Sequence, residues 1–178
     1  HLSVTKQAKL REIVALLGPL DAGAEALDVG GDNGLVSWRL RRQGGTWVSA
    51  DGSDKAVEAI RRLVGGTVER LEGAQLPFAD GRFDAVVIID YLEHVEDDQG
   101  FVAECHRVLK PGGRLIVNVP HAKPLAVLRP LRRLLGQTDA RHGHVRPGYT
   151  EAQLFAILKD GFDVQEVRTY SRFFVELL

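Results

Sequence analysis

Short apolar segments alternate with amphipathic segments along most of the chain, and this alternation limits the folds that it can adopt. The longest apolar segment is Phe83–Ile89 (FDAVVII), which is rich in β-branched residues and is typical of a central strand covered on both faces. Strands that alternate with helices form parallel sheets joined by right-handed crossovers. Ligands of such sheets bind at the carboxyl ends of the strands, so a functional site is expected at that edge.

Hydrophobic periodicity and turn residues predict the individual elements. Ser53 is a predicted helix cap, and residues 150–153 (TEAQ) form a predicted capping box. Helices are expected over residues 3–17, 35–42, 53–64, 99–109 and 150–159, and strands over residues 26–29, 46–50, 67–70, 83–89, 114–119 and 162–169. The prediction is an α/β fold, a Rossmann-like doubly wound, mostly parallel sheet with helices on both faces and six readable strands.

The length of 178 residues suits one domain, so residues 1–178 are predicted to form a single domain with a basic insertion at about 121–149. The insertion carries a net charge of +5 and the remainder −6. Residues 124–135 are a predicted basic amphipathic helix, either a lid on the domain or a contact with an anionic membrane or acceptor. A single cysteine, Cys105, and the lack of a signal-peptide core or of an apolar run of about 20 residues favour a cytoplasmic location, with membrane association as a further hypothesis.

Three segments at the predicted strand ends suggest a nucleotide-like ligand. Residues 27–34 (LDVGGDNG) place Asp28 at the end of the first strand, followed by a glycine turn that either admits a ligand to the backbone or merely connects strand and helix. Asp51 ends the second strand, where a carboxylate can accept both ribose hydroxyls or can cap the next helix. Residues 72–75 (EGAQ) follow the third strand, where they either contact an adenine edge or form an ordinary turn.

Together these segments resemble the class I S-adenosylmethionine-dependent methyltransferases, specifically the small bacterial kind with an LPF segment. The resemblance runs from about residue 26 to residue 119 through LDVGGDNG, VSADGS, LEGAQLPFADGRFDAVVIIDYLEHVED and HRVLKPGGRLIVNVP. It implies S-adenosyl-L-methionine as cofactor and methyl transfer to a small-molecule or lipid-linked acceptor, with an anionic acceptor as a further hypothesis. The cofactor-binding residues that it implies are Asp28, Gly30, Gly31, Asp32, Gly34, Asp51, Gly52, Glu72, Gly73, Ala74, Asp90 and Tyr91. The seventh strand usual in the family is missing or lies beyond the chain end.

Asp32 departs from the family pattern, which usually has glycine at the middle of the turn. Aspartate tolerates left-handed backbone better than most residues, so the turn can persist. The charge would repel the methionine carboxylate but attract the ammonium or sulfonium. The alternative function is therefore a non-catalytic cofactor-binding or scaffold protein of the same fold. A nicotinamide-dependent oxidoreductase is less favoured, because Gly-x-Gly-x-x-Gly is absent.

Methyl transfer needs a general base only when the acceptor must lose a proton, and histidine has a suitable pKa. The candidate catalytic residues are His94, His121 and His144. His121 and His144 are favoured as acceptor-site groups, because His94 is at least as consistent with a structural role. No metal site is predicted, because His142, His144 and Asp139 lack the spacing of a known ligand set. Nucleic acid is not an expected partner, since the whole chain is not basic.

Overall fold

The core of the protein is a five-stranded parallel sheet. The computed structural model describes residues 4–122 and 145–169. The strands are β1 (Glu25–Val29), β2 (Thr46–Asp51), β3 (Val68–Arg70), β4 (Phe83–Ile89) and β5 (Leu109–Asn118), in the order β3-β2-β1-β4-β5. All four strand pairs are parallel, as predicted. The strand order reverses between β1 and β4, which is where α/β sheets bind their ligands.

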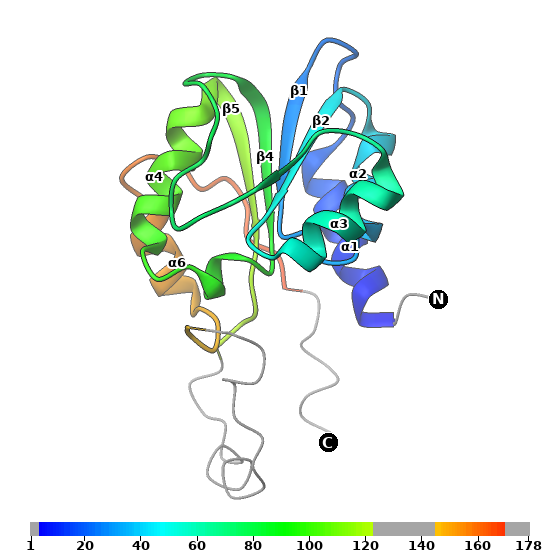
Figure 1. Ribbon diagram of the computed structural model, residues 1–178. Coiled ribbons are helices and arrows are strands. Elements are labelled where there is room, and N and C mark those ends of the chain that lie inside the picture. Colours follow the sequence, from blue (N-terminus) through cyan, green and yellow to red (C-terminus); the bar gives the residue numbers. More distant parts are fainter. Residues whose placement is uncertain (1–3, 123–144, 170–178) are drawn as a thin grey trace, which may run out of the picture.

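Helices cover both faces of the sheet, which confirms the doubly wound prediction (Figure 1). The helices are α1 (Val4–Leu17), α2 (Leu35–Leu40), α3 (Asp54–Val64), α4 (Asp98–Val108) and α6 (Glu151–Leu158), with short 3₁₀ turns η1 (Arg41–Gln43) and η2 (Leu92–His94). Figure 1 shows α1, α2 and α3 on one side of the sheet and α4 and α6 on the other. The Ser53 cap accepts from the N–H of Ala56, and the Thr150 capping box is present.

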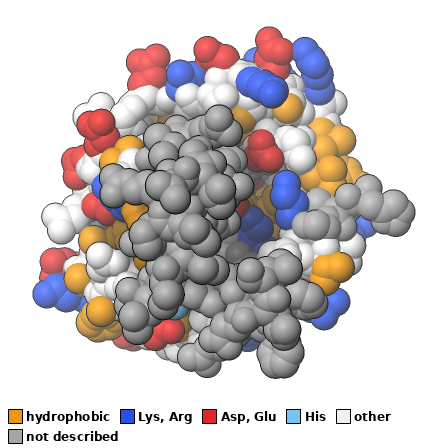
Figure 2. Space-filling view, turned by 90° about the horizontal axis from the view of Figure 1, so that it is seen from below, with side chains coloured by type: hydrophobic (Ala, Val, Ile, Leu, Met, Phe, Trp, Pro, Cys, Tyr) orange, Lys and Arg blue, Asp and Glu red, His pale blue; other side chains and the backbone are white. Residues whose placement is uncertain are grey.

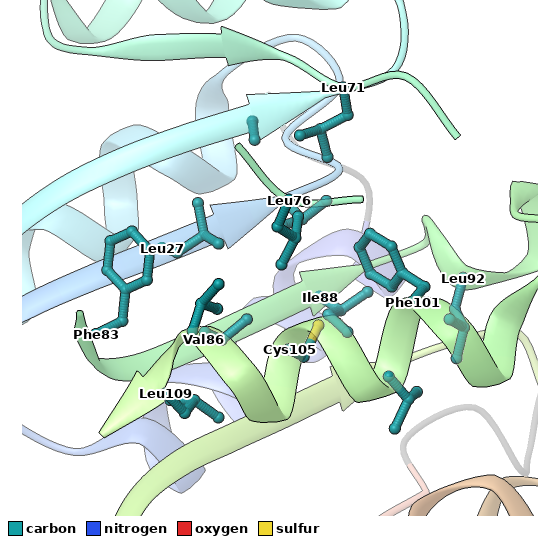
Figure 3. Close-up of a cluster of buried hydrophobic side chains, with 14 of the residues drawn as sticks. Leu27, Leu71, Leu76, Phe83, Val86, Ile88, Leu92, Phe101, Cys105 and Leu109 are labelled. Carbon is teal, nitrogen blue, oxygen red and sulfur yellow. The ribbon is translucent and has the colours of Figure 1, made fainter. Parts of the chain in front are cut away.

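Alternate residues of each strand feed two hydrophobic clusters, as the period of two along a strand requires. On β4, Val86 and Ile88 pack toward α4, whereas Ala85 and Val87 pack toward α1. Figure 3 shows Phe101 and Cys105 of α4 directed at the strand residues Val86 and Ile88. Both faces of the central strands are therefore buried, which explains the continuous apolar run of residues 83–89.

The LPF segment (residues 76–78) is held against α4 by one arginine. The Arg107 guanidinium donates to the carbonyl oxygens of Leu76 at 2.9 Å and Phe78 at 2.8 Å, and it pairs with Glu104 and Asp80. Glu104 in turn accepts from the N–H of Leu76 at 3.0 Å. The connection between β3 and β4 is thus ordered by side-chain bonds to its backbone rather than by regular secondary structure.

The sixth strand, expected over residues 162–169, is absent from the part of the chain that the structure describes. An edge strand on this sheet would bury every second residue, but the alternation ends after Val164, and Val167 is 61% exposed. Phe162 instead sets its ring edge-on to His106 of α4 at 5.5 Å between centroids. The segment packs on the helix layer, so the six-strand prediction was wrong by one strand.

The described ends of the predicted insertion meet each other. His121 forms a parallel β-bridge with Tyr149, and the N–H of Ala122 donates to the Tyr149 carbonyl at 2.9 Å. Residues 123–144, which include the predicted amphipathic helix at 124–135, lie outside the described residues. Among residues 4–122 and 145–169, no helix combines the length and apolarity that a membrane crossing requires.

Candidate functional site

The glycine turn after β1 lies directly against the end of β4. Gly30 has φ +86°, and a Cβ there would fall 2.1 Å from the carbonyl oxygen of Ile89, so only glycine allows this approach. Gly31 and Gly34 face the protein instead, since their Cβ atoms would meet Ser37 and the Ile60 backbone. Asp32 lies between them with φ +48° and an exposed side chain. The turn therefore keeps the left-handed backbone that glycine usually supplies.

Asp28 is buried beneath this turn. Its carboxylate is fully inaccessible and accepts hydrogen bonds from the Ser37 and Ser49 hydroxyls and the Arg41 guanidinium. Burial raises the pKa of the Asp28 carboxyl, and these donors oppose that shift only in part. Asp28 thus joins β1, β2 and α2 around the turn, and the cofactor contact that the resemblance implied for it stays a prediction.

Asp51 stands at the tip of β2 beside the turn, and it is 8% exposed. It accepts from the N–H of Ser53 at 2.9 Å, and the N–H of Gly30 in the turn donates to the carbonyl of Ala50 at 3.1 Å. Burial is the main reason that the pKa of the Asp51 carboxyl is raised, whereas the backbone of Ser53 and Asp32 and the nearby His94 lower it. The predicted ribose carboxylate thus lies beside the glycine turn.

Tyr91 closes the same site from β4. A Cβ on Gly52 would lie 2.9 Å from the Tyr91 hydroxyl, and the ring packs 5.5 Å from that of Phe101. Burial and the Asp51 charge raise the pKa of Tyr91 to about 12. Asp90 points elsewhere, toward α1, where it forms an ion pair with Lys9. Its backbone is left-handed, with φ +45°.

The segment after β3 lies next to Asp51, because the N–H of Leu71 donates to the Asp51 carbonyl at 3.0 Å. Glu72 and Gly73 are exposed, and no described atom lies within 4 Å of a Cβ built on Gly73. Ala74 packs against the core cluster on the α4 side. The position fits the adenine assignment for residues 72–74, which stays a prediction.

The structure describes two of the three candidate histidines, His94 and His121. His94 ends η2 and lies close enough to lower the pKa of both Asp51 and Glu93. His121 is exposed beyond β5 and is bridged to Tyr149, whose own hydroxyl is bound to Asp98 and Leu92. His144 lies outside the described residues. His94 is therefore the one described histidine whose charge reaches Asp51.

Glu93 was missed by the sequence reasoning. It is 1% exposed, and within the described part of the chain neither carboxylate oxygen has a hydrogen-bond partner. Burial is the main reason that the pKa of Glu93 is raised, and the nearby Asp90 adds to it. The signal was present in the segment LEHV, where a charged residue stands between the apolar residues Leu92 and Val95.

Figure 2 views the edge at which the strands end, and both acidic and basic side chains lie around it. Among residues 4–122 and 145–169, no three His, Cys, Asp or Glu side chains gather as a metal-ligand set.

A doubly wound sheet with a glycine turn, a carboxylate at the tip of β2 and an aromatic residue after β4 defines a nucleotide-cofactor-binding α/β domain.

Comparison with known proteins identifies the family within this class to which the chain belongs. Residues 27–117 match the family described as "Methyltransferase domain", which is just over half of the chain, so the chain belongs to that family. It is 33% identical over 136 residues to demethylmenaquinone methyltransferase of Tropheryma whipplei (strain Twist), covering 75% of this chain and 56% of the relative. It is also 33% identical over 117 residues to ubiquinone biosynthesis O-methyltransferase of Azotobacter vinelandii, covering 60% of this chain and 49% of the relative. The chain thus spans about half the length of the curated relatives it matches.

The fold is shared with solved methyltransferase structures. Phosphoethanolamine N-methyltransferase 2 of Haemonchus contortus, solved in complex with S-adenosyl-L-methionine, superposes with a TM-score of 0.68 at 19% identity, covering 86% of this chain and 36% of that one. At this identity the likeness shows the fold alone.

Proposed function

We propose that the chain binds S-adenosyl-L-methionine and transfers its methyl group to a small-molecule or lipid-linked acceptor. The observation that carries the proposal is the position of Asp51 at the tip of β2 beside the glycine turn, at the point where the strand order reverses. The Asp51 carboxylate fits the cofactor, because a carboxylate at a strand tip can accept hydrogen bonds from two ribose hydroxyls. Family membership and the S-adenosyl-L-methionine complex of a fold neighbour support the same cofactor.

Some residues of the proposed site contact the cofactor, and others hold those residues in place. Asp51 accepts from the ribose hydroxyls, the backbone of residues 30–34 lies along the amino-acid part, and residues 72–74 border the adenine. The Tyr91 ring forms the wall on the β4 side, next to Asp51 and Gly52. Asp28 holds the turn from below. When bound, the cofactor supplies a methyl group on a sulfonium, an already activated leaving group, so this site accelerates transfer mainly by orientation.

An acceptor that loses a proton on methylation also needs a base. His94 is the best-placed described histidine, because it ends η2 and lies close enough to Asp51 and Glu93 to lower their pKa values. His121 lies farther along the chain beyond β5. We therefore rank His94 above His121 as the proton acceptor.

Calorimetry with S-adenosyl-L-methionine, its demethylated product and NAD tests the cofactor. We expect both adenosyl ligands to bind and NAD not to bind. Asp51→Ala should weaken binding of S-adenosyl-L-methionine by roughly 1.5–3 kcal/mol, the range for a charge-assisted hydrogen-bond partner. Asp54→Ala is the matched control, because Asp54 is an exposed carboxylate three residues along that pairs with Arg70. Wild-type affinity in a folded Asp51→Ala variant would contradict the ribose assignment.

We also propose that the basic insertion directs the chain to an anionic surface in the cytoplasm. The names of two relatives refer to menaquinone and ubiquinone, which is compatible with a lipid-linked acceptor. Each basic residue near an anionic membrane contributes on the order of 1 kcal/mol. Replacing Arg129, Arg132 and Arg133 with glutamate should abolish co-sedimentation with anionic vesicles at low salt and leave cofactor affinity unchanged. A wild-type chain that ignores such vesicles at low salt would refute membrane contact.

A further inference from the structure

A depression of about 550 Å³ lies between residues 146–150 and α6, next to the end of β5. Its volume falls within the range of small-molecule sites. Apolar groups from three segments line it, namely Ala122 after β5, Pro147, and the pair Ala156 and Ile157 on α6. Two large apolar residues that adjoin the lining in sequence, Val145 and Phe155, are more than half exposed, at 51% and 55%. This depression, here called the α6 groove, is separate from the glycine turn and Asp51.

The two charged side chains of the α6 groove are paired with each other. Its charged lining residues are Asp98 and Arg146, and they form an ion pair at 2.5 Å. Thr150 and Gln153 bond to each other in the capping box of α6. The described lining therefore has no unbalanced charge to offer an anion or a cation. Its remaining accessible surface complements an uncharged, apolar guest.

Hydrogen bonds join the wall of the α6 groove to η2, the 3₁₀ turn that follows β4. The N–H groups of Val145 and Arg146 donate to the Glu93 carbonyl at 3.0 and 3.3 Å, and the Tyr149 hydroxyl donates to the Leu92 carbonyl at 3.2 Å. Leu92 and Glu93 belong to η2, which ends at His94. The groove wall is thus bonded to η2, which directly follows Tyr91 of the candidate site.

We propose that the α6 groove binds an uncharged hydrocarbon chain, which on the proposed function is the non-reacting tail of a lipid-linked methyl acceptor. Such a tail would be held near the carboxyl ends of β4 and β5, with its head group directed along η2. Binding energy from a remote part of a substrate is one means of orienting its reacting atom. The groove then selects for acceptors that carry a tail, while Asp51 and the turn select the cofactor.

The test uses the full chain and two isoprenoid alcohols, farnesol and the shorter prenol. Their binding is followed by the NMR shifts of the Ala122 and Ile157 methyl groups. Farnesol should shift both in a saturable way, and prenol should bind at least about 10-fold more weakly because it buries fewer CH₂ groups. Ala156→Trp, which fills the groove, should weaken farnesol binding about 10-fold or more. Ala152→Trp, on the same helix outside the lining, is the matched control and should keep affinity within about twofold.

A second pair, Ala156→Glu and Ala152→Glu, tests the groove without added bulk. The first variant places a charge in a neutral groove and should also weaken farnesol binding, whereas the second should not. Unshifted Ala122 and Ile157 methyl groups, or equal farnesol affinity in the Ala156 and Ala152 variants, would overturn the inference. Calorimetry with S-adenosyl-L-methionine is independent of these results. Cofactor binding without farnesol binding refutes the groove alone, and farnesol binding without cofactor binding supports the groove while refuting the proposed function.

Discussion

The hydroxyl of Tyr91 occupies the space that a side chain on Gly52 would need, with 2.9 Å between the oxygen and an ideal Cβ at residue 52. Gly52 directly follows Asp51 at the end of β2, and Tyr91 follows β4. These two strands are not neighbours, because β1 lies between them. The contact therefore spans the glycine turn and joins both sides of the candidate cofactor site.

Gly52→Ala should displace the Tyr91 ring and weaken S-adenosyl-L-methionine binding by roughly 1–3 kcal/mol, the usual cost of overpacking. The atom nearest to the new methyl group is the hydroxyl, so Tyr91→Phe should relieve much of the conflict. A double-mutant cycle measured by calorimetry would then show coupling between the two positions. Strictly additive effects would show that the contact does not control cofactor binding.

Asp32→Gly should leave cofactor affinity unchanged or raise it. Asp32 has φ +48°, which glycine adopts without strain, and its like charge near Asp51 would be removed. The backbone N–H of residue 32, which helps to lower the pKa of Asp51, is kept in the variant. The measurement is calorimetry with S-adenosyl-L-methionine. A large loss of affinity would instead identify the Asp32 carboxylate as a ligand of the cofactor ammonium group.

Glu93→Gln should stabilise the protein near neutral pH. The pKa of Glu93 is raised in the folded state by burial, so the folded protein favours the protonated carboxyl. Stability is then lost as the pH rises from the ordinary value of 4.5 toward the higher folded pKa. The Glu93→Gln variant avoids this loss, so its Tm should exceed that of the wild type near neutral pH. The difference in Tm should shrink as the pH falls below 4.5.

Asp84→Asn is the control for Glu93→Gln, and its effect on stability should have the opposite sign. The pKa of Asp84 is lowered mainly by its hydrogen bond from Lys110, so its contribution to stability is present above the ordinary value of 3.8 and is lost as the pH falls. This variant should be less stable than wild type near neutral pH, and the difference should shrink in acid. Thermal unfolding at several pH values checks both variants, and two shifts of the same sign would contradict the assignment.

Arg107→Lys should destabilise the fold by roughly 1–3 kcal/mol, because lysine cannot bridge the Leu76 and Phe78 carbonyls together with Glu104. Urea unfolding measures the change. Arg62→Lys is the matched control, since Arg62 forms only an exposed pair with Glu58 one helical turn away. The expected effect there is at most about 0.5 kcal/mol. Equal effects of the two changes would mean that Arg107 does not anchor the LPF segment.

The sheet and its helices were predictable because their signals are local. The run of residues 83–89, the Ser53 cap and the capping box at Thr150 each depend on residues close in sequence. The environment of a carboxylate is not local. Asp28 and Asp51 both end predicted strands, yet Ser37, Ser49 and Arg41 enclose Asp28, whereas Asp51 keeps some exposure beside the turn.

The same limit explains the strand that was predicted and not found. Phe162 and Val164 are apolar residues at alternate positions, as in a strand. Whether such a segment pairs with a sheet edge or packs on a helix depends on partners far away in the chain. Here His106 of α4 supplies the packing surface for Phe162.

The position of β1 between β2 and β4 has a consequence for synthesis. Ala26 pairs with Trp47 soon after it in sequence, but its other partner, Ala85, is translated much later. A nascent chain that ends before Phe83 therefore exposes the backbone of an apolar strand along one open edge, which is the kind of edge that associates with other chains. Pairing of distant segments is also slow. Ribosome-bound or truncated fragments that lack β4 should consequently depend on chaperones, whereas chains that extend through β4 can close the sheet themselves.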